Sequence, residues 1–184
     1  MKERVKIFID GSNFFYYCKE IGIPTFPQFD FATFSKFLTG NRRLIEQVYY
    51  IGAVRAKPGD DKAMRMMANQ MKFFAYLKKH DWKINKGYLL KSNGKHQEKG
   101  VDVKLALDLA LGAVDNTYDT AILVSSDTDI LPAVEQVQLR GKKLEYIGFS
   151  HRPSMALVAK SNIRRLLTEA DLNKCTEGKG RKKK

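Results

Sequence analysis

Residues 120–129 read TAILVSSDTD, an apolar run that ends in two serines and two aspartates. Short apolar runs bounded by turn residues are typical of strands that are buried on both faces of a parallel sheet. Residues 5–13, VKIFIDGSN, repeat this arrangement near the start of the chain. In open parallel sheets, ligands bind beyond the carboxyl ends of the strands. The two stretches therefore predict a parallel sheet and the edge of that sheet that carries its chemistry.

Outward from these stretches, strand-like and helix-like segments alternate along the chain. The predicted strands are residues 5–9, 48–54, 82–90, 120–124 and 144–148. The predicted helices are residues 14–21, 31–38, 60–79, 101–114, 130–140 and 155–160. An Asn-Gly pair at residues 93–94 predicts a hairpin turn. Alternation of this kind predicts one α/β domain, a three-layer α/β/α sandwich around a mostly parallel five-stranded sheet.

Two of the predicted helices carry apolar stripes at helical spacing, which are typical of core packing. In the helix at residues 60–79 the stripe consists of Met64, Met67, Met71 and Phe74. In the helix at residues 101–114 the stripes are Val101, Leu105 and Leu109, and Val103, Leu107 and Leu111. An exposed part of the methionine-rich helix could also serve a homodimer. Ser12 is predicted to cap the first helix.

The charge of the chain points to a polyanionic partner. Its 184 residues include 33 Lys and Arg against 20 Asp and Glu, which gives a net charge of +13 at pH 7. Such a surplus favours nucleic acid or an anionic membrane surface. Residues 78–104 hold eight lysines against three acids, although a solvated surface would explain this run equally well. We expect a domain over residues 1–172 and a disordered basic tail over residues 173–184.

Several classes of protein are excluded. The chain has neither a membrane-length apolar run nor the features of a signal peptide, so we expect a cytoplasmic protein without a membrane partner. Cys18 and Cys175 form no C-x-x-C pair, and Cys175 is expected in the polar tail. Phosphate-loop and dinucleotide motifs are absent. The three histidines, His80, His96 and His151, are scattered in polar contexts.

Four aspartates are expected to meet at the carboxyl edge of the sheet. Asp10 follows the first strand, and Asp127 and Asp129 follow the fourth. Asp102 stands in the first turn of the helix at residues 101–114, where it could also be a simple helix-start acid. Clustered carboxylates raise one another's pKa and cost stability unless a cation lies between them. The pattern favours a hard divalent ion, Mg²⁺ or Mn²⁺.

Three blocks of sequence together resemble a known family. They are IFIDGSNFF at residues 7–15, KGVDVKLALDLAL at residues 99–111 and AILVSSDTDILPAVEQVQLRGKKLEYIG at residues 121–148. In order and content they resemble the NYN domain family, in particular its LabA/DUF88 branch, within the PIN-like nucleases. The resemblance implies an α/β/α sandwich with strand order 3-2-1-4-5 and metal-dependent ribonuclease activity.

The resemblance also implies roles for single residues. The positions that match the family's catalytic and metal-binding residues are Asp10, Asn13, Asp102, Asp127 and Asp129. Asp10 and Asp127 are expected to bind the metal directly, and Asp102 and Asp129 directly or through water. This chain departs from the family's pattern at Ser12, where many relatives carry Glu, and at Ser126, where many carry Gly.

These residues predict hydrolysis of an RNA phosphodiester by a metal-activated water. Ser12, Ser125 and Ser126 are expected to orient water or the phosphate. The expected phosphate contacts are Lys91, Lys95, Lys99 and Lys104. Phe14, Tyr16 and Tyr17 could stack on unpaired bases, or pack against the sheet. Two alternatives remain, an RNA-binding adaptor or regulator without catalysis, and a metal-dependent nuclease that acts on DNA.

Overall fold

The computed structural model describes residues 1–92 and 95–176, and the side chains of this part except those of residues 88–92 and 95–99. Three of the predicted phosphate contacts, Lys91, Lys95 and Lys99, fall outside the described side chains. The predicted hairpin turn at residues 93–94 and the last eight residues of the predicted tail fall outside the described part.

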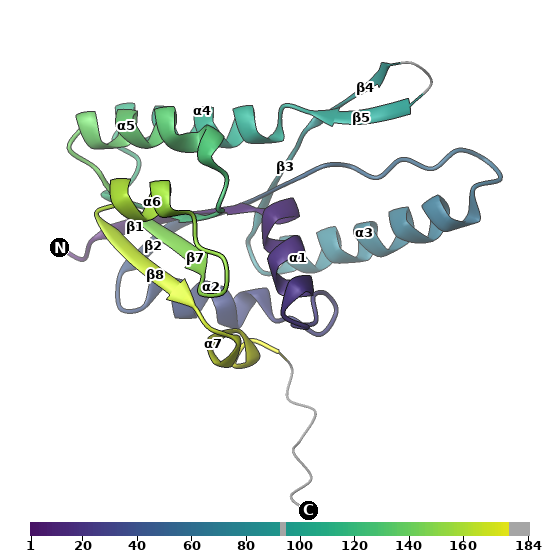
Figure 1. The fold of residues 1–184 in the computed structure, drawn as a ribbon, viewed down its shortest axis with the longest axis horizontal. Helices are drawn as coiled ribbons and strands as arrows, with labels where there is room; N and C mark the ends of the chain where they lie inside the picture. Colours follow the sequence, from purple (N-terminus) through teal and green to yellow (C-terminus); the bar gives the residue numbers. More distant parts are fainter. Residues whose placement is uncertain (93–94, 177–184) are drawn as a thin grey trace, which may run out of the picture.

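A parallel sheet forms the centre of the molecule (Figure 1). In spatial order its strands are β3 (Lys83–Lys86), β2 (Arg43–Ile51), β1 (Arg4–Asp10), β6 (Thr120–Val124), β7 (Lys143–Phe149) and β8 (Ile163–Leu167). Every neighbouring pair in this sheet is parallel. The first five strands confirm the predicted order 3-2-1-4-5. The strand order reverses between β1 and β6, which places the binding edge of the sheet beyond these two strands.

The sequence pattern does not predict the sixth strand, β8. Its residues, IRRLL, include two arginines, and only Leu167 of the five is buried. Because an edge strand pairs on one side only, it needs less apolar surface than the central strands. β6, by contrast, is buried at every position, as its sequence predicted.

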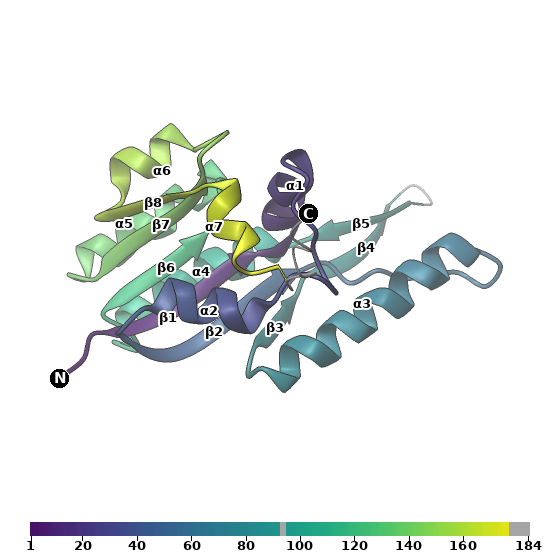
Figure 2. The same ribbon diagram turned by 90° about the horizontal axis from the view of Figure 1, so that it is seen from below.

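Helices cover both faces of the sheet, which confirms the three-layer sandwich (Figures 1 and 2). One face packs against α1 (Gly11–Glu20), α2 (Phe31–Thr39), α3 (Asp61–Lys79) and α7 (Glu169–Asn173). The other face packs against α4 (Val101–Val114), α5 (Leu131–Leu139) and α6 (Met155–Lys160). The first core is rich in phenylalanine, and the second is mostly aliphatic.

The predicted strand at residues 82–90 is divided in the structure. Its first part is β3, and its second part, β4 (Tyr88–Ser92), leaves the sheet and pairs antiparallel with β5 (Lys95–Lys99). Gly87 lies between the two parts, and its N–H donates to the carbonyl of Ile51 at 3.3 Å. The β4–β5 pair agrees with the predicted hairpin and leads directly into α4.

The methionine stripe of α3 is largely exposed, so the prediction that it packs in the core was wrong for most of its length. Phe74 is buried, but Met64 and Met71 are 47% and 50% exposed. Figures 1 and 2 show the reason, because the first half of α3 extends beyond the sheet. Only the last turns of the helix lie over β-strands that can cover them.

One of the two apolar stripes of α4 is also exposed. Val101, Leu105 and Leu109 are buried against the sheet and α5, as predicted, whereas the stripe of Val103, Leu107 and Leu111 is more than half exposed. The prediction of a helix buried on both stripes was therefore wrong. Periodicity identifies an apolar face, but it does not say whether another element covers that face.

The chain packs on the domain up to Thr176. Cys175, expected in a polar tail, is buried, and its carbonyl accepts a hydrogen bond from the N–H of Asp30 at 2.6 Å. Thr176 forms a β-bridge with Phe29. The division at residues 172 and 173 stays a prediction.

Among the described residues, no helix combines the length and apolarity that crossing a membrane requires.

Candidate metal centre

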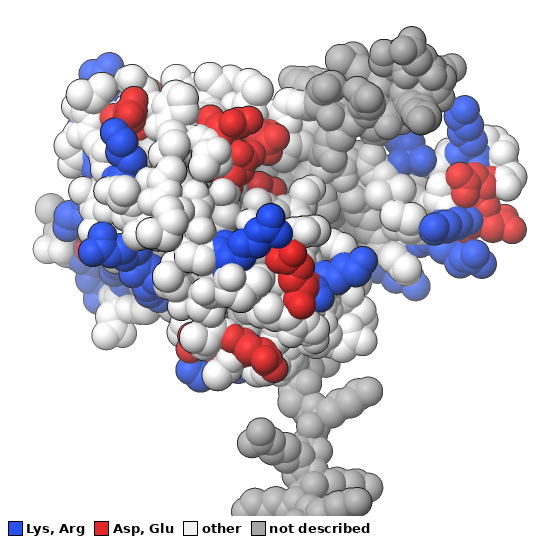
Figure 3. Space-filling view, in the orientation of Figure 1, with Lys and Arg blue, Asp and Glu red and all other residues white. Residues whose placement is uncertain are grey.

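Three of the four predicted aspartates meet at the carboxyl edge of the sheet. Carboxylate oxygens of Asp10, Asp102 and Asp127 all lie within 4.8 Å of one another. Asp10 ends β1, Asp102 lies in the first turn of α4, and Asp127 follows β6. Figure 3 shows acidic side chains gathered near the start of α4, while basic side chains are scattered over the rest of that face.

Asp10 is held in place by both of its carboxylate oxygens. One accepts the backbone N–H of Asn13 at 3.0 Å, and the other accepts the hydroxyl of Ser125 at 3.1 Å. Asp10 is therefore the N-cap of α1, and the prediction that Ser12 caps this helix was wrong. Both residue types cap helices well, but Asp10 is the residue at which β1 ends and α1 begins.

The charge of Asp10 is disfavoured in this position. The side chain is only 4% exposed, and burial raises its pKa to about 6, with smaller contributions from the charges of Asp102 and Asp127. The two hydrogen bonds act in the opposite direction, since they stabilise the ionised form. A carboxylate with a raised pKa beside two other acids is the electrostatic pattern that a bound cation relieves.

Asp102 approaches the cluster from α4. Gly100 precedes this helix with a φ of 84°, a left-handed conformation that glycine adopts without strain and that starts the helix directly after β5. Burial raises the pKa of Asp102, and the charges of Asp127 and Asp129 raise it further. Asp102 thus shares the site with the other acids and is more than a helix-start residue.

Asp127 and Asp129 lie in the turn after β6. One carboxylate oxygen of Asp127 accepts the N–H of Asp129 at 3.0 Å and caps the short 3-10 helix η1 (Thr128–Ile130). Asp129 itself is exposed and lies outside the group of three. Its charge contributes to the raised pKa of Asp102, and we call its exposed position in η1 the rim of the site.

Asn13, Ser125 and Ser126 join the two turns that carry the acids. The side-chain oxygen of Asn13 accepts the N–H of Ser126 at 3.0 Å. The hydroxyl of Ser125 donates to Asp10 and accepts the N–H of Asp127 at 3.1 Å. These residues fix the acids relative to one another, a positioning role that their sequence pattern does not reveal.

Tyr146 supports this arrangement from β7 and was not identified from the sequence. Its hydroxyl lies 2.9 Å from the hydroxyl of Ser126 and accepts the N–H of Ser154 at 2.9 Å. The side chain is fully buried. A tyrosine within a buried strand resembles any core aromatic residue in the sequence, so its hydroxyl gave no signal.

Two other predicted contacts have different surroundings from those expected. Lys104 forms an ion pair with Asp108, whose carboxylate also accepts hydrogen bonds from Tyr50 at 2.9 Å and Asn85 at 2.7 Å. Lys104 is thus tied to its own helix. Ser12 is exposed on α1 and lines an apolar cavity whose lining does not include Ser126.

Of the three aromatic residues proposed for stacking, two are packed in the protein. Phe14 is buried, and Tyr17 stacks on Phe149 with ring centroids 5.1 Å apart. Tyr16 is half exposed and meets Tyr17 edge to face. Packing therefore explains Phe14 and Tyr17.

A parallel sheet in this order, with carboxylates clustered at its switch point, is consistent with a PIN-like nuclease fold. The sequence model of the NYN domain matches residues 4–166, and the chain belongs to the NYN domain family, which is part of the PIN-like nuclease superfamily. Membership of the LabA/DUF88 branch stays a prediction.

A solved structure shares the fold. The chain is similar to protein VPA0982 from Vibrio parahaemolyticus, described as a protein of unknown function, with a TM-score of 0.70 and 24% sequence identity. The match covers 91% of this chain and 94% of that chain. No curated protein matches the chain.

Proposed function

We propose that this protein is an endoribonuclease that depends on Mg²⁺ or Mn²⁺. The observation that carries the proposal is the group of Asp10, Asp102 and Asp127, whose carboxylate oxygens lie within 4.8 Å of one another at the switch point of the sheet. Membership of a nuclease family supports hydrolysis as the reaction.

The donor set fits a small hard cation. Mg²⁺ and Mn²⁺ prefer oxygen ligands such as carboxylates. The three carboxylates each offer an oxygen, and these oxygens lie within 4.8 Å of one another, close enough to share one ion. When bound, the ion would supply a water of lowered pKa and would stabilise the leaving oxygen.

In the proposed reaction the residues of the site would have different roles. Asp10, Asp102 and Asp127 would hold the ion, and Asp129 at the rim would bind it through water. Asn13 and Ser125 keep the acids in register through their hydrogen bonds. The main contribution of the protein to the reaction would be this fixed geometry.

RNA as the substrate is supported by charge and by family resemblance. The net charge of +13 attracts a polyanion, whereas the acids at the site repel one. The surface along which RNA reaches the acids must therefore carry basic side chains. β4–β5 ends two residues before α4 begins, and its sequence contributes Lys91, Lys95 and Lys99, which we propose as phosphate contacts.

Cleavage assays test this function. Labelled single-stranded RNA, hairpin RNA and single-stranded DNA would be incubated with Mg²⁺, Mn²⁺ or EDTA. We expect cleavage of RNA that requires the metal and falls by at least about 100-fold in Asp10→Asn and Asp127→Asn, in line with the loss of a charge that stabilises the transition state.

Asp115→Asn is the matched control, because Asp115 caps the opposite end of α4 and the chemical change is the same. It should cleave like the wild type. Equal cleavage by the wild type and Asp10→Asn would refute the assigned site. Preference for DNA would refute RNA as the substrate, and salt-sensitive binding without cleavage would favour an adaptor.

A further inference from the structure

A cavity of about 540 Å³ is lined in part by the first turn of α1, which directly follows Asp10. The side chain of Asn13 accepts the N–H of Ser126, whereas Ser12 and Phe15 line the cavity. The volume is within the range of about 300–1,000 Å³ that is typical of small-molecule pockets. We call this cavity the aromatic pocket.

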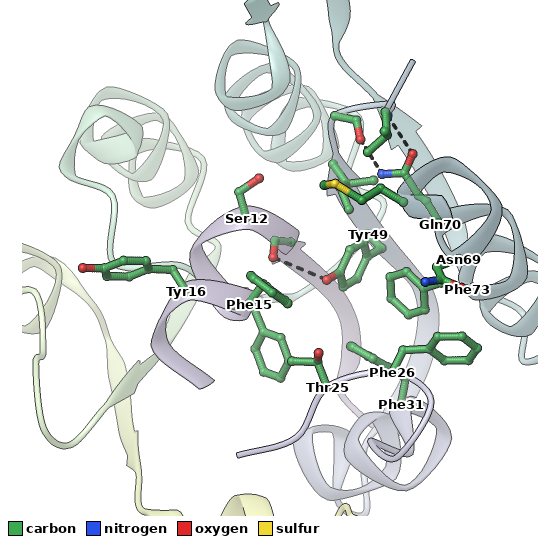
Figure 4. Close-up of a pocket in the computed structure, with 16 residues that line it drawn as sticks. Ser12, Phe15, Tyr16, Thr25, Phe26, Phe31, Tyr49, Asn69, Gln70 and Phe73 are labelled. Atoms are coloured by element: carbon green, nitrogen blue, oxygen red, sulfur yellow. Dashed lines mark hydrogen bonds between the residues drawn. The ribbon is translucent and has the colours of Figure 1, made fainter. Parts of the chain in front are cut away.

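The walls of the aromatic pocket are built mainly from rings. Phe26 lies in the segment before α2, and Phe31 is the first residue of α2. Tyr49 comes from β2 and Phe73 from α3. Figure 4 shows these rings and Phe15 gathered around the cavity, while the ring of Tyr16 points away. Phe15 is 52% exposed, so a large part of its ring is open to a ligand.

Few polar groups reach this pocket, and they lie at different points of its wall. Ser12, Thr25 and Asn69 contribute polar side chains. Gln70 is engaged in the fold, since its amide accepts the N–H of Val54 at 2.8 Å and donates to the carbonyl of Gly52 at 2.7 Å. A ligand that fits must therefore be flat and apolar over its faces, with hydrogen-bonding groups at its edge.

The backbone places the aromatic pocket next to the acids. Gly11, which directly follows Asp10, forms part of the wall, and the hydroxyl of Tyr49 donates to the Gly11 carbonyl at 3.4 Å. A Cβ at residue 11 would collide with the Tyr49 ring, so glycine permits this close packing. The wall of the aromatic pocket thus begins one residue after an acid of the candidate metal centre.

We propose that the aromatic pocket receives one unpaired nucleobase of the RNA strand, next to the phosphodiester at the acids, with Phe15 as the stacking residue and Asn69 as a contact to the base edge. This inference rests on the proposed function and extends it to substrate selection. A paired base is stacked within its helix, so capture of a base requires a single strand or an extruded nucleotide.

Fluorescence of 2-aminopurine tests base capture directly, because stacking quenches this base analogue. A single-stranded RNA of ten nucleotides would carry the analogue at each position in turn and would be titrated in EDTA at low salt. We expect quenching at one position, loss of that quenching in Phe15→Ala, and binding weakened roughly 5- to 150-fold, the range for one lost base stack.

The other variants separate stacking from folding. Phe15→Tyr keeps the ring and should retain the quenching. Asn69→Ala should retain the quenching and reduce the preference among the four bases. Leu139→Ala, which removes a large exposed apolar side chain from the end of α5, should behave like the wild type.

Base capture and cleavage can fail separately. Quenching at one position without metal-dependent cleavage would leave the aromatic pocket standing and refute the proposed hydrolysis. Cleavage without quenching at any position would refute the aromatic pocket and leave the hydrolysis standing. Equal quenching by the wild type and Phe15→Ala would also overturn the assignment of Phe15.

Discussion

At the scale of single residues, the candidate site is a set of acids held against their own repulsion. Asp10 is buried, and its carboxylate is fixed by Asn13 and Ser125 beside two further acids. Groups arranged for function in this way commonly reduce the stability of the fold. Removing the charge of Asp10 should therefore change stability and activity in opposite directions.

In buffer without divalent metal at pH 8, Asp10→Asn is expected to raise the free energy of unfolding by about 1–3 kcal/mol. The estimate follows from the rise of the Asp10 pKa from 3.8 to about 6, at about 1.4 kcal/mol per pKa unit. Asparagine keeps the oxygen that accepts the Asn13 N–H. Urea denaturation measures the difference, and Asp115→Asn shows the effect of the same chemical change outside the site, at the C-terminal end of α4.

The pH dependence of this difference follows from the sign of the shift. The folded pKa of Asp10, about 6, lies above the unfolded value, so the folded chain binds this proton more tightly. The free-energy cost of ionising Asp10 in the folded chain therefore grows as the pH rises from the unfolded to the folded pKa. It is complete above the folded pKa. The gain in Asp10→Asn should be near zero at about pH 4 and constant above about pH 7. A gain that is already full at about pH 4 would contradict burial as its cause.

Tyr146→Phe tests whether the hydroxyl of Tyr146 on β7 stabilises the turn after β6, which carries Ser126 and Asp127. Loss of the hydroxyl leaves the N–H of Ser154 and the hydroxyl of Ser126 without this partner. We expect a loss of about 1–3 kcal/mol in unfolding free energy. In the cleavage assay kcat should fall more than KM rises, because the turn that carries Asp127 would lose its position. Unchanged kcat would restrict Tyr146 to stability.

At the scale of helices and strands, the sequence predicted the buried strands well but did not predict which faces of α3 and α4 are exposed. Strands β1 and β6 were predicted because their apolar runs have few polar interruptions, and the positions of Asp10 and Asp127 followed from the rule for parallel sheets. The exposure of the α3 methionines depends on how far the helix extends beyond the sheet. Local sequence does not contain that information.

Two substitutions in α3 compare its buried part with its exposed part. Phe74→Ala should lower the unfolding free energy by about 3–5 kcal/mol, since it empties a packed site. Met71→Lys, one turn earlier on the exposed part, should change it by less than about 0.5 kcal/mol. A loss above about 1 kcal/mol for Met71→Lys, together with weaker self-association in sedimentation, would show that a second copy covers the stripe, as the predicted homodimer requires.

At the scale of the whole molecule, the net charge of +13 was the first indication of a polyanionic partner, and the structure adds where the acids lie within it. Charge composition could not reveal the aromatic pocket, because its rings come from segments far apart in the chain. The cytoplasmic location stays a prediction.

Truncation after residue 177 tests the contribution of the basic end, which holds five cations in its last seven residues. We expect weaker RNA binding for every sequence, and a slope of log K against log salt that is shallower by up to about 3.5. The position of the cut should be unchanged, because the acids and the aromatic pocket are intact. Filter binding at several salt concentrations, combined with mapping of the cut ends, measures both.

The two outer strands of the sheet give the basic surplus a further consequence. β3 has four residues with an exposed lysine at each end, and β8 carries two consecutive arginines. Short, cationic outer strands resist pairing with the strands of another copy, because like charges would be brought together. The basic surplus that we propose attracts RNA would thus also oppose pairing of the sheet edges with another copy.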